Sequence, residues 1–140
     1  MRHLFLVLSL FLFSCSDGPE DFIPYVEGYW EIKKVTLPNG FQKEYSINET
    51  IDFIRVNDSL KGFRKKLKPG INNTYYTSDD AEAIQLKIED DSLRIYYTTP
   101  YNTWKETVLS ANENELVILN ENKAVYLYNR YESIELSTSE

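Results

Sequence analysis

The amino-acid sequence predicts an all-β protein, an antiparallel meander of about eight strands joined by short turns. Two observations lead to this prediction. Apolar and polar residues alternate along much of the chain after residue 27, which is the pattern of a strand with one buried face. The chain also holds 11 Tyr and 7 Phe but only 5 Gly, a composition that suits a pleated, half-buried surface.

Turn-forming residues divide the chain into segments of strand length. Asn39-Gly40 and Pro69-Gly70 are strong turn signals at the ends of two apolar runs. The stretch 71–80 is expected to hold a strand edge and a loop. The expected strands cover residues 29–37, 50–56, 60–67, 83–89, 93–97, 103–111, 116–120 and 124–131.

The first residues of the chain have the pattern of a secretory signal. Arg2 supplies a positive charge, and the apolar run from Leu4 to Phe13 is too short to span a bilayer, which takes about 20 residues. The sequence therefore predicts four segments. They are a signal peptide over 1–14, a lipidated cysteine and acidic tether over 15–27, the folded domain over 28–135 and a frayed tail over 136–140.

The end of this signal carries a more specific motif. Leu12-Phe13-Ser14-Cys15 resembles the lipobox of bacterial lipoproteins, in which a small residue precedes the cysteine. The resemblance implies cleavage before Cys15 and lipidation of Cys15, which would anchor the protein in the outer membrane of the cell envelope. The acidic residues that follow also resemble the surface-export signal of Bacteroidetes lipoproteins, which implies display on the cell surface.

The start and end of the folded domain resemble a known family. Gly28-Tyr29-Trp30 is similar to the Gly-x-Trp opening of lipocalins, and Arg130 stands where lipocalins place a basic residue over the tryptophan. Over 28–131 the chain resembles the small lipocalin-like lipoproteins of Bacteroidetes. The resemblance implies a closed lipocalin-like (calycin) barrel. It also implies structural roles for Trp30, which would close one end, and for Arg130, which would pack on its ring. Alternatively, Trp30 is an ordinary core aromatic residue.

The residues that remain after export exclude several chemistries. His3 is the only histidine and Cys15 the only cysteine, so the mature chain would lack both an imidazole and a free thiol. Serine–histidine and cysteine–histidine catalysis are then impossible in their usual form, and zinc or haem would lose their preferred ligands. We expect no enzyme activity, no metal and no cofactor. The formal net charge of −7 argues against nucleic acid as a partner, because phosphates demand a basic face.

Aromatic residues form the candidate ligand-binding set. Tyrosine and tryptophan rings can stack on sugars, or they can line an apolar pocket with their polar ends exposed. The same residues could equally reflect strand propensity and core filling. The candidates are Tyr75, Tyr76, Tyr96, Tyr97, Tyr101, Trp104, Tyr126 and Tyr128.

Charged residues form two further clusters. A basic run could bind lipid phosphates or acidic polysaccharide, or it could keep an exposed edge strand from pairing with other chains. Carboxylates at 79–82 and 89–91 could serve glycoside hydrolysis or calcium binding, although they fall at expected turns. The basic run consists of Lys61, Arg64, Lys65, Lys66 and Lys68.

Together these patterns favour a membrane-anchored binding protein of the cell envelope. Its expected ligand is a small hydrophobic molecule inside the barrel or a glycan. The alternative is a structural or inhibitory protein that docks on an envelope protein and has no internal ligand. A cavity would separate the two, because a closed interior filled by side chains excludes an internal ligand.

Overall fold

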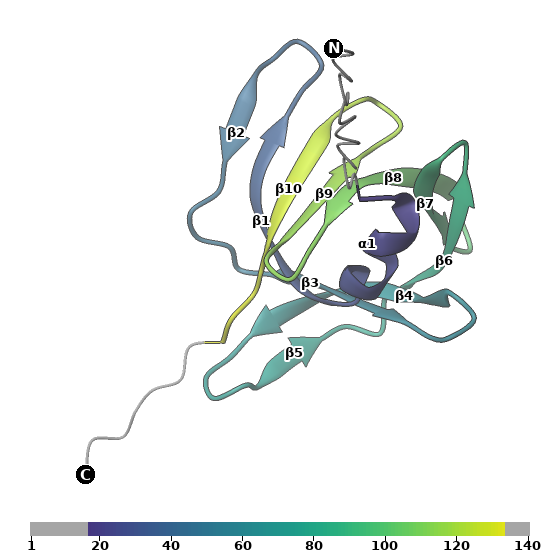
Figure 1. The fold of residues 1–140 in the computed structure, drawn as a ribbon. Helices are drawn as coiled ribbons and strands as arrows, with labels where there is room; N and C mark the ends of the chain where they lie inside the picture. The colour runs from purple at the N-terminus through teal and green to yellow at the C-terminus, as the bar shows by residue number, and fades with distance from the viewer. Residues whose placement is uncertain (1–16, 134–140) are drawn as a thin grey trace, which may run out of the picture.

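Eight antiparallel strands close into a barrel in the computed structural model, which describes residues 17–133 (Figure 1). Each strand pairs with the next in chain order, and β10 pairs with β1 to complete the ring. This arrangement confirms the predicted all-β barrel. Its strands are β1 (Gly28–Thr36), β3 (Ile51–Val56), β4 (Lys61–Pro69), β6 (Glu82–Glu89), β7 (Ser92–Thr98), β8 (Thr103–Ala111), β9 (Glu115–Leu119) and β10 (Val125–Arg130).

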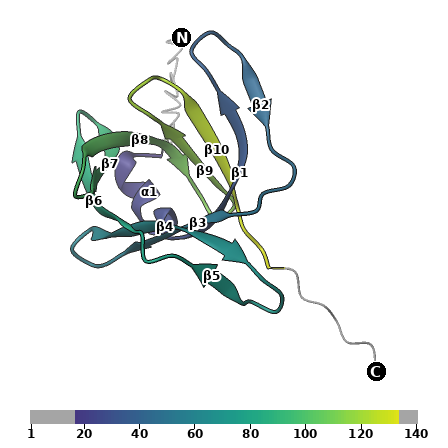
Figure 2. The same ribbon diagram turned by 180° about the vertical axis from the view of Figure 1, so that it is seen from behind.

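Two short strands lie beside the barrel wall (Figure 2). β2 (Gln42–Glu44) pairs with the second half of β1, and β5 (Tyr75–Thr77) pairs with the end of β4. β2 was not predicted, because its three residues are all exposed and show no apolar alternation. β5 lies within 71–80, where a strand edge was expected.

The expected tether is wrong for much of its length, because a helix, α1 (Pro19–Val26), occupies it. Pro19 stands in the first turn, where a missing N–H costs nothing. Phe22 and Ile23 are partly buried against the core and Val26 is fully buried, and their spacing places all three on one helical face. No helix within 17–133 is long and apolar enough to cross a membrane. The signal peptide, Cys15 and the tail over 136–140 lie outside the described residues.

α1 lies at one end of the barrel and contacts β3, β6, β7 and β8. The apolar core lies at this end, and Trp30 is completely buried within it, with its Nε1 donating a hydrogen bond to the Val26 carbonyl at 2.9 Å. The guanidinium carbon of Arg130 lies 3.9 Å from the centre of the Trp30 ring, which is the contact that the lipocalin resemblance implied. The buried residues around Trp30 include Val26, Ile54, Leu86, Leu93, Ile95, Ala111, Leu116 and Ile118.

Candidate ligand-binding site at the open end of the barrel

The opposite end of the barrel contains an open cavity of about 610 Å³. The Thr99–Tyr101 segment borders it, whereas the turn between β8 and β9 lies beside α1, so cavity and helix are at opposite ends of β8. Small-molecule sites in proteins commonly occupy about 300–1,000 Å³. The interior is therefore filled by side chains near α1 and open at the other end.

One wall of the cavity consists of aromatic rings. Trp104 on β8 stacks on Tyr97 of β7, with ring centres 4.9 Å apart and planes 5° from parallel. Tyr126 and Tyr128 lie in line on β10, with ring centres 6.4 Å apart. Tyr101 stands at the rim and is 96% exposed. Apart from Tyr101, which lies between β7 and β8, these rings come from strands whose alternation directs every second side chain inward.

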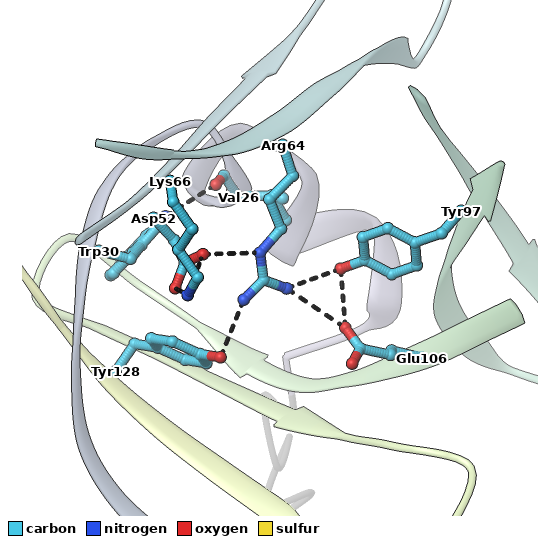
Figure 3. A network of polar contacts seen from close by, with 8 residues as sticks. All are labelled: Val26, Trp30, Asp52, Arg64, Lys66, Tyr97, Glu106 and Tyr128. Carbon is cyan, nitrogen blue, oxygen red and sulfur yellow. Dashed lines mark hydrogen bonds and ion pairs between the residues drawn. The ribbon is translucent and has the colours of Figure 1, made fainter. Parts of the chain in front are cut away.

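The base of the cavity is polar and is organised by Arg64 on β4 (Figure 3). Its Nε donates to Oδ1 of Asp52 at 3.2 Å, and its Nη2 donates to the Tyr128 hydroxyl at 2.9 Å. Its Nη1 donates to the Tyr97 hydroxyl at 2.8 Å and to Oε2 of Glu106 at 3.4 Å. All three guanidinium nitrogens thus have partners within the protein, and the group is fixed in one position.

Further hydrogen bonds tie the partners of Arg64 to one another. The Tyr97 hydroxyl donates to Oε2 of Glu106 at 2.7 Å. The ammonium of Lys66 contacts Asp52 at 2.7 Å, although 63% of the Lys66 side chain is exposed. Asp52 therefore forms ion pairs with two basic side chains, although only 4% of its own side chain is exposed. A buried carboxylate of this kind persists because its charge is paired and hydrogen-bonded.

Burial and the charges within this network shift the pKa values of its side chains. Burial alone would raise the pKa of Asp52, but the charges of Arg64 and Lys66 outweigh burial and lower it. Burial raises the pKa of Tyr128 to about 12, although Arg64 partly opposes the shift. Burial likewise raises the pKa of Tyr97 far above its ordinary value. Both tyrosines therefore stay protonated at neutral pH, and Tyr97 acts as a hydrogen-bond donor to Glu106.

Glu82, at the start of β6, also lines the cavity and, unlike Asp52 and Glu106, forms no ion pair with Arg64. No hydrogen bond or ion pair joins its side chain to another residue within 17–133. Burial raises the pKa of Glu82, and the negative charges of Asp52 and Glu106 add to this effect. Arg64 and Lys66 offset it only in part. Glu82 is thus a carboxylate of the cavity that the protein does not neutralise by direct contact, and Asp80 likewise makes no hydrogen bond or ion pair with another residue within 17–133.

The structure brings five of the eight candidate aromatic residues into the cavity and leaves three outside it. Tyr75 stacks on Tyr29 on the outer face of the barrel, with ring centres 5.0 Å apart, and Tyr76 is exposed. Tyr96 lies on the face of β7 opposite Tyr97 and donates to Glu89. Those that line the cavity are Tyr97, Tyr101, Trp104, Tyr126 and Tyr128.

The basic run does not form one surface, which corrects the expectation for it. Arg64 points into the barrel, where only 11% of its side chain is exposed, whereas the ammonium of Lys65 lies over the Phe63 ring. The alternative of edge protection is also wrong, because β4 pairs with both β3 and β6. Neighbouring residues of a strand point to opposite faces, so a run of charges along a strand is divided between two environments.

Sequence reasoning missed Asp52 and Glu106 and considered Glu82 only as part of a turn. The alternation of inward and outward residues could have identified both. Asp52 stands two residues before the buried Ile54, and Glu106 stands two residues before the buried Val108, so each occupies an inward position in a strand whose other inward residues are largely apolar. A charged residue at an inward position marks a polar site inside a barrel. Asp90 and Asp91 behave as turn residues, since both adopt positive φ angles between β6 and β7. Within 17–133, no three His, Cys, Asp or Glu residues are grouped to hold a metal ion.

Comparison with known proteins identifies the family. The model of a family described as a lipocalin-like domain matches residues 26–118, which is more than half of the chain. The chain therefore belongs to the lipocalin-like domain family, as the sequence resemblance indicated. No curated protein sequence matches the chain.

Two solved structures resemble the fold at low sequence identity. A lipocalin-like protein from Bacteroides uniformis is 7% identical, with a TM-score of 0.47, and the match covers 75% of this chain and 97% of that one. An uncharacterized protein from Bacteroides eggerthii is 11% identical, with a TM-score of 0.46 and coverage of 75% and 98%.

Proposed function

We propose that this chain is a lipid-anchored protein of the bacterial cell envelope that binds a small organic ligand at the open end of its barrel and catalyses no reaction. The cavity of about 610 Å³ carries this proposal, because it combines ring faces with a fixed polar base. Lipocalin-like folds are typically binding folds, and ligand sites are concave, with a few well-placed polar groups. The open half of the interior favours this function over a purely structural envelope protein.

The polar base favours a ligand with hydrogen-bonding groups over a purely apolar one. A wholly apolar molecule would bury Glu82 and the network of Arg64 without replacing their contacts with water, which costs free energy. A ligand with one flat or apolar part and one polar part would satisfy both the aromatic wall and the base. Glycans have this character, and Trp104 offers them a stacking surface.

The remaining chemistry supports a non-catalytic role. Asp52 and Glu106 are held by Arg64, so neither can serve with Glu82 as the second free carboxylate that glycoside hydrolysis requires. The only histidine would be removed with the signal peptide, and Cys15 would carry the lipid. These features favour binding over nucleophilic catalysis.

Tryptophan fluorescence tests the binding proposal on the mature chain without its lipid. Octyl β-glucoside is a suitable probe because it joins an alkyl chain to a neutral sugar. We expect it to shift the emission of Trp104 with a Kd of about 1 mM or lower. The variant Trp104→Phe should lose the response, while Trp30, which is buried beside α1, is not expected to report the probe. An unchanged spectrum with octyl β-glucoside, with octyltrimethylammonium and with octanoate would contradict the proposal.

Cell fractionation tests the anchor. We expect the wild-type protein in the outer-membrane fraction, and the variant Cys15→Ser either in the soluble fraction or unprocessed, because the thiol is the expected lipid acceptor. Protease treatment of intact cells then tests surface display. A variant that is still cleaved and membrane-bound would show that the lipoprotein proposal is wrong.

A further inference from the structure

The ligand that this cavity selects can be inferred from the charges that its own residues leave unsatisfied. We propose that the ligand is an organic cation, an amine or quaternary ammonium compound, received by the ring faces of Trp104 and Tyr126 and by the carboxylate of Glu82. This inference rests on the proposed function, since it requires that the cavity binds a ligand.

The basic residues at the cavity are engaged by other groups. Each nitrogen of Arg64 donates to a protein oxygen, and two carboxylates offset its charge. Lys66 pairs with Asp52 at 2.7 Å, and Lys65 lies over the ring of Phe63, 5.5 Å from its centre. An anionic ligand, such as a fatty acid, would therefore have to displace existing contacts to reach Arg64 or Lys66, whereas Lys65 follows the inward-facing Arg64 on β4 and points to the opposite face.

Acceptors for a cation, in contrast, remain available. Glu82 lines the cavity without an ion pair or hydrogen bond to any residue within 17–133. The contacts of Glu106 with Arg64 and Tyr97 both use Oε2, which leaves Oε1 of this side chain for a ligand. Asp80 adds a further carboxylate at the rim. A positive group at this position would reduce the mutual repulsion of carboxylates that the protein only partly offsets.

The aromatic wall suits the same chemistry. The faces of tryptophan and tyrosine rings carry negative electrostatic potential, so they attract ammonium groups and are a recurrent means of binding quaternary ammonium ligands. Trp104 is held by stacking on Tyr97, and Tyr126 stands beside Tyr128. The rings are thus oriented in advance by their neighbours. A cavity with ring faces on one side and a carboxylate on the other therefore offers an organic cation both cation–π contacts and a nearby opposite charge.

Three probes with one alkyl chain and different head groups test the inference: octyltrimethylammonium, octyl β-glucoside and octanoate. Isothermal titration on the mature chain should give octyltrimethylammonium about tenfold tighter binding than octyl β-glucoside, with octanoate weakest. The variant Glu82→Gln should weaken binding of the ammonium compound by about tenfold, so that its affinity falls to that of octyl β-glucoside for the same variant. Glu115→Gln is the control, because Glu115 lies beside α1 at the opposite end of the barrel.

The possible outcomes separate this inference from the proposed function. Equal binding of the three probes, or tighter binding of octanoate, would overturn the inference and leave the binding function standing. An unchanged affinity of Glu82→Gln for octyltrimethylammonium, with a circular dichroism spectrum like that of the wild type, would also overturn the inference. Absence of binding by all three probes would overturn both.

Discussion

Arg130 lies over the ring of Trp30, with its guanidinium carbon 3.9 Å from the ring centre. The same guanidinium donates to the carbonyl of Glu27 at 2.8 Å and to that of Tyr25 at 3.2 Å, where α1 ends. Its Nε donates to the Glu113 carbonyl in the turn between β8 and β9 at 2.9 Å. One side chain therefore joins the helix, the buried tryptophan and a distant turn at the closed end of the barrel.

The variant Arg130→Lys should lower the free energy of unfolding by about 2 kcal/mol, because a lysine retains the charge but cannot reach several carbonyls at once. Urea denaturation monitored by circular dichroism measures this loss. Arg55→Lys is the matched control, since Arg55 is exposed on β3, and it should change stability by about 0.5 kcal/mol or less. Equal effects of the two substitutions would show that the contacts of Arg130 do not stabilise the barrel.

Gly62 on β4 is a second position where the fold tolerates little change. A Cβ atom there would lie 1.7 Å from the carbonyl oxygen of Arg55 on the neighbouring strand, and this oxygen belongs to the backbone. We expect Gly62→Ala to cost about 3 kcal/mol or more, measured by urea denaturation. Gly40→Ala is the contrast, because a Cβ at Gly40 meets no atom within 4 Å, although φ is 86° there. Its cost should be about 1–2 kcal/mol, from backbone strain alone. A Gly62→Ala protein as stable as Gly40→Ala would refute the steric argument.

The barrel was predictable from the sequence because inward and outward residues alternate with little interruption. The pattern Ile84, Leu86 and Ile88 and the pattern Leu93, Ile95 and Tyr97 each define a strand without knowledge of its neighbours. α1 was not predictable in this way. Two prolines and three acidic residues between 17 and 24 suggested a tether, and the three apolar residues that pack on the barrel gain their stability from tertiary contacts rather than from helix propensity.

The candidate site was predictable only in its aromatic half. Tyrosines and tryptophans stand out in a sequence, and alternation placed Tyr97 and Trp104 on inward faces. Arg64 was hidden among four lysines of similar charge, and its role depends on partners 12 to 64 residues away in the chain. A network made by pairing between distant strands has no local sequence pattern, so only the barrel reveals it.

Asp52 should make the stability of the protein depend on pH in acid. Its pKa is held below the ordinary 3.8 by Arg64 and Lys66, so its stabilising contribution is complete above pH 3.8 and is lost as pH falls through its lowered value. Asp52→Asn should cost about 3 kcal/mol at neutral pH and less in strong acid, since the wild type also loses the charge there. Urea denaturation of both proteins over this range measures the difference. The control Asp58→Asn, in an exposed turn, should show no such convergence, and a constant cost of Asp52→Asn at all pH values would contradict the argument.

Glu82, unlike Asp52, should lower the stability of the folded protein at neutral pH while it strengthens binding of the cationic ligand. Burial, together with the charges of Asp52 and Glu106, raises the pKa of Glu82 above the ordinary 4.5, although the charges of Arg64 and Lys66 oppose this shift. The carboxyl group of Glu82 therefore loses its proton at a higher pH than an ordinary glutamate does. Ionising it therefore costs the folded protein free energy as pH rises through that value. Glu82→Gln should be as stable as the wild type at neutral pH, or more stable, while it binds octyltrimethylammonium more weakly.

The pH profile of binding separates this role from a structural one. In the wild type, affinity for octyltrimethylammonium should fall as pH is lowered through the raised pKa of Glu82, before an ordinary glutamate would take up a proton. In Glu82→Gln the affinity should be lower and nearly independent of pH over the same range. Titration calorimetry at several pH values, alongside urea denaturation, measures both quantities. A variant that lost stability and kept the wild-type pH profile would place Glu82 in the framework of the barrel, not in its ligand site, because a residue retained for binding weakens the ligand complex rather than the fold when it is replaced.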